Sequence, residues 1–114
     1  MTKVTRVEVD LAVAKALANI NDQDLLASAV RVSLDWLATQ HPGRSVEVRV
    51  PPYRVVQILE GTTHRRGTPP AVVEMSPQTW LHLIGKQLVW ADGASQGLII
   101  ASGDRSDLSQ LFTD

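Results

Sequence analysis

The sequence predicts an α+β domain in which a mostly antiparallel sheet packs against helices. Three observations favour this class: apolar residues repeat with helical spacing over residues 22–40, they alternate with polar residues over 46–50, and short apolar runs follow between helix-starting signals. With 114 residues, of which 44% are hydrophobic and 20% charged, the chain has enough material for one domain with its own core.

Composition excludes several classes of protein. The chain has no cysteine, which rules out disulfides, thiolate metal sites and cysteine nucleophiles, and is compatible with the cytoplasmic localisation that we expect. Eleven basic residues against twelve acidic ones give no basic field, so no nucleic-acid partner is expected. No apolar run approaches the ~20 residues of a membrane span, so we expect a soluble protein without integral membrane association.

The first forty residues predict helices. Residues 4–20 fit a strand or a helix, and the alanines of residues 12–18 favour a helix in the second half, so we expect residues 1–20 to form a helical extension before a domain over 21–114. Residues 22–40 predict an amphipathic helix, capped by Asn21 or Asp22, with Arg31 and Asp35 as an i,i+4 ion pair. Its expected apolar face comprises Leu25, Ala29, Val32 and Trp36.

After residue 40, the spacing of apolar residues changes from the 3.6-residue period of a helix to the two-residue period of a strand. Residues 46–50 predict a half-buried strand, residues 53–60 a more apolar and more central strand, residues 71–75 a third strand and residues 98–101 a buried one. Ser76 and Pro77 start a helix that ends near Gly85, a short helical turn covers residues 90–95, and a final helix is expected from Gly103 onward.

The sequence has few signs of a catalytic site. His41, His64 and His82 have no metal-ligand spacing, and no nucleophile elbow, phosphate loop or dinucleotide fingerprint occurs. We therefore expect no catalytic residues, no metal and no cofactor. An enzyme would need Glu60 or Glu74 as a base beside His64.

Two residue sets leave alternatives open. His64, Arg65, Arg66 and Thr68 could hold a carboxylate or phosphate, or form a solvated hairpin tip that keeps a sheet edge from aggregating. Three tryptophans stand among only five aromatic residues. They are either core anchors, or Trp80 and Trp90 flank a ligand cavity.

The order of motifs resembles the sterol carrier protein-2 family, especially its small bacterial homologues. The resemblance lies in Leu-His-Leu-Ile-Gly-Lys at 81–86, alanines at 91 and 94, Gly-Leu-Ile-Ile-Ala-Ser-Gly at 97–103, and the segments 41–53 and 66–74. It covers about residues 25–112.

The resemblance implies a five-stranded, mainly antiparallel sheet covered by helices on one face, an apolar tunnel between the layers, and non-catalytic lipid binding or transport. The expected tunnel lining is Trp80, Ile84, Trp90, Ile100 and Phe112, and the expected site for an anionic head group is His64, Arg65, Arg66 and Thr68. Few methionines and phenylalanines are available, so an acyl chain is a better candidate ligand than a large sterol. The alternative is a ligand-free interaction module, including a homodimer, that uses the same fold.

Overall fold

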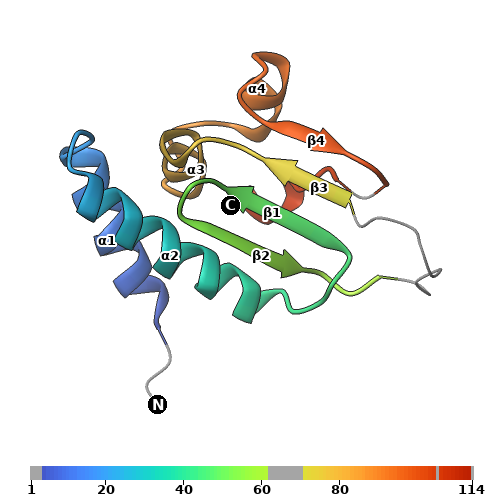
Figure 1. Cartoon of the computed structure of the whole chain (residues 1–114), viewed down its shortest axis with the longest axis horizontal. Helices are drawn as coiled ribbons and strands as arrows, with labels where there is room; N and C mark the ends of the chain where they lie inside the picture. The colour runs from blue at the N-terminus through green and yellow to red at the C-terminus, as the bar shows by residue number, and fades with distance from the viewer. Residues whose placement is uncertain (1–3, 62–70, 105, 114) are drawn as a thin grey trace.

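The computed structural model describes residues 4–61, 71–104 and 106–113 and confirms the α+β class (Figure 1). In chain order the elements are α1 (Arg6–Ala18), α2 (Gln23–Gln40), β1 (Val46–Val50), β2 (Arg54–Ile58), β3 (Ala71–Glu74), α3 (Pro77–Ile84), α4 (Trp90–Ser95), β4 (Ile100–Ser102) and the 3-10 helix η1 (Ser109–Phe112). The ambiguous first segment is a helix.

Side-chain caps explain where the three longer helices begin. The Thr5 hydroxyl accepts a hydrogen bond from the Glu8 N–H of α1 at 3.2 Å, and the Asp22 carboxylate accepts from two N–H groups in the first turn of α2, each at 3.1 Å. The cap of α2 is therefore Asp22 rather than Asn21. α3 begins as predicted, because Ser76 accepts from the Thr79 N–H and Pro77 occupies the first helical position.

The sheet differs from the expected one. The described residues form four strands in the order β2-β1-β3-β4, and no fifth strand lies among them. β1 pairs antiparallel with β2 and parallel with β3, and β3 pairs antiparallel with β4, so the sheet is mixed. The parallel pair arises because the chain, after the β1–β2 hairpin, adds β3 on the other side of β1.

Two strand predictions were wrong about burial. β2, predicted to be central, lies at one edge of the sheet, and its Val55 is 52% exposed. The run 98–101, predicted to be buried, contributes the other edge strand, where Ile100 is 60% exposed and Ile99 alone is buried. Edge strands have only one neighbour, which leaves more of each strand exposed to solvent.

The core lies between one face of the sheet and the helices. The inward side chains of β1, together with Ile58 and Val73, are fully buried, whereas their sequence neighbours point to the opposite, more exposed face. α2 packs on β2, and α1 lies against α2 on the side away from β2 (Figure 1). α1 adds Val9, Val13 and Ala16 to this same core.

The amphipathic face of α2 is turned relative to the prediction. Its buried residues are Leu26, Ala29, Val30, Ser33, Leu34 and Leu37. Leu25, Val32 and Trp36 are only half-buried, so three of the four residues of the predicted face flank the core. The buried arc is centred nearly one residue further along, because both the sheet and α1 cover α2.

Gly43 lets the end of α2 approach the end of β2. Its φ is +150°, and a Cβ atom there would lie 1.9 Å from the backbone carbonyl of Leu59. Beside it, the Leu59 N–H donates to the His41 carbonyl at 2.8 Å. Any side chain at residue 43 would separate these two segments.

The C-terminal helix expected from Gly103 is wrong as well. Beyond Gly103 the described residues contain one helical element, the short η1, and Asp107 before it accepts a hydrogen bond from the Ser109 N–H at 2.9 Å. Over the described residues we find no helix with the length and apolarity that crossing a membrane requires.

Candidate functional site

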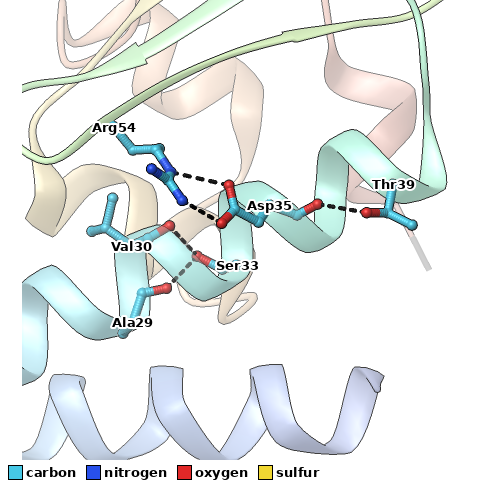
Figure 2. A network of polar contacts seen from close by, with 6 residues as sticks. All are labelled: Ala29, Val30, Ser33, Asp35, Thr39 and Arg54. Atoms are coloured by element: carbon cyan, nitrogen blue, oxygen red, sulfur yellow. Dashed lines mark hydrogen bonds and ion pairs between the residues drawn. The ribbon is translucent and has the colours of Figure 1, made fainter. Parts of the chain in front are cut away.

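A buried polar pair anchors α3 to α2. The indole N–H of Trp80 donates to the Ser33 hydroxyl at 2.8 Å, and both residues are fully buried. The Ser33 hydroxyl in turn lies 2.6 Å from the Ala29 carbonyl and 3.2 Å from the Val30 carbonyl (Figure 2). Trp80 is therefore a core anchor whose polar atom is satisfied within the protein.

Three aromatic rings meet near the C-terminus. Phe112 stacks on Trp90 with ring centroids 6.0 Å apart, and it meets Trp80 edge to face at 5.8 Å. Phe112 thus links the buried Trp80 to α4 and fixes η1 against the body of the domain.

A pocket of about 680 Å³ opens between α1, the end of α3 and η1. Its apolar lining is Val13, Ala14, Leu17, Leu83, Ile84, Leu111 and Phe112, and its polar lining includes Arg6, Asp10, Lys86, Gln87 and Thr113. An apolar floor with a few polar groups is the usual composition of small-molecule sites.

Gly85 and Lys86 shape the pocket wall at the end of α3. A Cβ atom on Gly85 would lie 2.8 Å from the Leu81 carbonyl, 3.1 Å from Leu17 Cδ1 and 3.2 Å from Val13 Cγ1, so the glycine allows α1 to approach α3 closely. Lys86 then has a φ of +64°, which ends the helix and reverses the chain along the pocket. The Gly-Lys pair of the sequence motif therefore lies in the pocket lining.

The polar lining carries charges of both signs. Arg6 Nε lies 3.0 Å from Asp10 Oδ1, and the Arg6 guanidinium also lies over the Trp36 ring, 4.9 Å from its centroid. Lys86, just after α3, is exposed and also lies in the lining. Two basic residues, Arg6 and Lys86, and one acidic residue, Asp10, therefore lie in the pocket lining, and Asp10 is paired with Arg6.

The residues predicted to line a tunnel lie in different parts of the structure. Ile84 and Phe112 line the pocket, Trp90 stacks behind Phe112, and Trp80 is sealed in the core. Ile100 lies apart from these four, because its register with Glu74 places it on the exposed face of the sheet. The predicted head-group residues His64, Arg65, Arg66 and Thr68 lie outside the described residues.

Sequence reasoning missed the contribution of α1. Val13, Leu17 and Arg6 of α1 belong to the pocket lining, as does Leu111 of η1. A signal was present, because α1 has apolar residues on two faces rather than one. The second face could have indicated a helix with more than one packing surface.

The described residues offer little for catalysis. Glu74 is exposed on the open face of the sheet, and the His82 Nδ1 lies 2.7 Å from the Gln78 carbonyl of its own helix. Within the same described ranges no group of three or more histidines and carboxylates could hold a metal ion.

Asp35 joins α2 to β2 rather than to Arg31. Its carboxylate receives two hydrogen bonds from the Arg54 guanidinium, at 3.0 and 2.5 Å (Figure 2). The hydrogen bond, and then the charge of Asp35, raise the pKa of Arg54 above its usual value. Arg31 lies over the Tyr53 ring instead, 6.0 Å from the centroid. Each side chain of the predicted pair therefore contacts a residue in β2 or directly before it.

Residues 22–113 match a family model described as bacterial SCP ortholog, where SCP stands for sterol carrier protein. This segment contains every described element except α1. A search of curated proteins gave no significant match.

Proposed function

We propose that this chain, which belongs to the bacterial SCP ortholog family, is a non-catalytic carrier that binds a single-chain lipid in the pocket between α1, α3 and η1. The observation that carries the proposal is the pocket itself. Its volume of about 680 Å³ falls in the range of small-molecule sites, and its apolar side chains converge from three elements.

The energetics favour an acyl chain of moderate length. Burial of each methylene contributes ~0.8 kcal/mol, and a dissociation constant of ~1 μM corresponds to ~8.2 kcal/mol. About ten buried methylenes would therefore be needed before the costs of ordering the ligand. We expect affinity to rise about fourfold per added methylene until the pocket is full.

The test is a binding series on the whole chain. Saturated fatty acids of increasing length are titrated while tryptophan fluorescence is recorded, since Trp90 stacks on Phe112 in the pocket lining. Native mass spectrometry of freshly expressed protein shows independently whether a lipid is retained.

Two matched variants locate the site. Leu111→Glu places a charge in the pocket lining, whereas Leu98→Glu places one on a residue that is 43% exposed and outside the pocket. We expect the first variant to lose ~10-fold or more in affinity, because a carboxylate resists burial beside an acyl chain, and the second to change little. An apo mass together with no length-dependent quenching would contradict lipid binding and would favour the ligand-free interaction module.

A further inference from the structure

α1 has an exposed apolar stripe opposite the face that it buries. Val7, Leu11, Ala14 and Ala18 recur at i, i+4, i+7 and i+11, which places them on one side of the helix. Val7 and Leu11 are each 66% exposed, and both alanines are exposed, although Ala14 also borders the pocket. The buried residues Val9, Val13 and Ala16 occupy the other side, against α2. Two large aliphatic side chains thus face solvent one turn apart.

We infer that this stripe is the interface of a homodimer in which α1 packs antiparallel against α1 of a second copy. When the pairing is centred between Ala12 and Val13, Val7 lies opposite Ala18 of the second copy and Leu11 lies opposite Ala14. Each large side chain therefore meets a small one, along the whole stripe and in both directions. This pattern lets the two helices approach closely without a void.

The charges beside the stripe fit the same pairing. Glu8 and Lys15 are seven residues apart, so they lie on the same flank of the stripe, and both are exposed. A two-fold axis perpendicular to the helices brings the same flank of each copy together. Glu8 of one copy and Lys15 of the other then differ by about 3 Å in position along the helix axis. Two Glu–Lys pairs result. On the other flank, Arg6 and Asp10 already neutralise each other.

The stripe fits a protein surface better than a lipid surface. Membrane-surface helices need a polar face rich in lysine and arginine, whereas Arg6, Glu8, Asp10 and Lys15 of α1 sum to zero. The helix has 13 residues, about 20 Å, which is too short to bury the ~1,200 Å² of a standard stable interface. We therefore expect a weak dimer in equilibrium with the monomer.

Sedimentation equilibrium of the whole chain over about 1 μM to 1 mM measures this association. Leu11→Glu should leave a monomer throughout, while Val55→Glu, at a similarly exposed valine on the sheet, should behave as wild type. Circular dichroism confirms that each variant folds. Ligand binding by the pocket is measured separately, so failure of the carrier proposal and failure of this one are distinguishable.

Charge exchange gives the sharpest test of register and orientation. Lys15→Glu or Glu8→Lys alone places like charges together twice per dimer and should raise the dissociation constant about fivefold or more. The double variant Glu8→Lys with Lys15→Glu should return to within about threefold of wild type. Wild type that stays monomeric, equal effects of Leu11→Glu and Val55→Glu, no rescue in the double variant, or binding of anionic vesicles that Leu11→Glu abolishes would each overturn the inference.

Discussion

At the scale of the residue, the clearest dependence is that of Trp80 on Ser33. A fully buried indole N–H has access to few acceptors, and the Ser33 hydroxyl meets it at 2.8 Å. Serine is usually a weak helix residue, yet here its hydroxyl donates to a carbonyl of its own helix (Figure 2) and accepts from the Trp80 N–H of α3. One small polar side chain therefore positions a large apolar one.

Replacing Ser33 by alanine should lower the free energy of unfolding by about 1–3 kcal/mol, because the Trp80 N–H loses its acceptor in the core. Urea unfolding followed by circular dichroism measures the change. Thr39→Ala is the control: Thr39 makes the equivalent bond to the Asp35 carbonyl at 2.9 Å, but in an exposed position, and its loss should cost less than about 0.5 kcal/mol. Equal losses in the two variants would contradict the role given to Ser33.

At the scale of the element, the sequence predicted where helices begin and end better than how the elements pack against one another. The bounds of α2, the Ser76 start of α3 and the turn at residues 90–95 follow from caps, proline and periodicity, which are local, and all three are confirmed. Which face of α2 is buried, and that β2 lies at an edge, depend on neighbours far away in the chain. Composition alone could not rank the strands, because Val55 is apolar and yet faces solvent.

The candidate site was predictable in part for the same reason. Ile84 and Phe112 lie on helices whose apolar residues the sequence identifies, and both reach the pocket. Ile100 was placed with them, although strand alternation and the register with Glu74 put it on the exposed face. The contribution of α1 was hidden, since a helix with two apolar faces does not reveal which one meets α3.

The start of η1 gives an element-scale prediction about pH. The hydrogen bond from the Ser109 N–H lowers the pKa of Asp107 below its ordinary value of 3.8. A lowered folded pKa means that the carboxylate stabilises the fold above the unfolded value and loses this effect as pH falls through the folded value. The Tm of wild type should exceed that of Asp107→Asn at about pH 6, and the gap should narrow as the pH falls below 3.8 and through the lowered folded pKa.

Differential scanning calorimetry across this pH range measures that gap. A difference in Tm that persists unchanged in acid would mean that side-chain shape, rather than charge, matters at residue 107. η1 carries Leu111 and Phe112 into the pocket lining, so the same variant should bind a fatty acid more weakly at neutral pH.

At the scale of the whole molecule, the carrier proposal requires a group that compensates the charge of an anionic lipid. The pocket offers Lys86, while the sequence predicts the cluster of His64, Arg65 and Arg66 with Thr68, which lies outside the described residues. We propose Lys86, because it belongs to the same lining as the apolar floor. The cytoplasmic location and the division into residues 1–20 and 21–114 stay predictions.

Lys86→Met should weaken binding of a fatty acid by ~10- to 150-fold, since a charge-assisted contact contributes ~1.5–3 kcal/mol, and should barely affect its methyl ester. Methionine keeps an apolar stem of similar length, so the wall of the pocket is retained. Arg65→Ala with Arg66→Ala is the comparison, titrated with the same two ligands. A selective loss for the acid in that double variant, and none in Lys86→Met, would make the arginine cluster the head-group site.

Two stretches of the chain line the pocket, and the family match covers one of them. α3, residues 85–87 and η1 lie inside the segment that matches the family, whereas α1 precedes it. Substitutions confined to Arg6, Asp10, Ala14 and Leu17 would alter the volume and charge of the pocket while every residue of the sheet stayed the same. In the proposed carrier, one wall of the binding site is therefore encoded outside the residues that build the sheet.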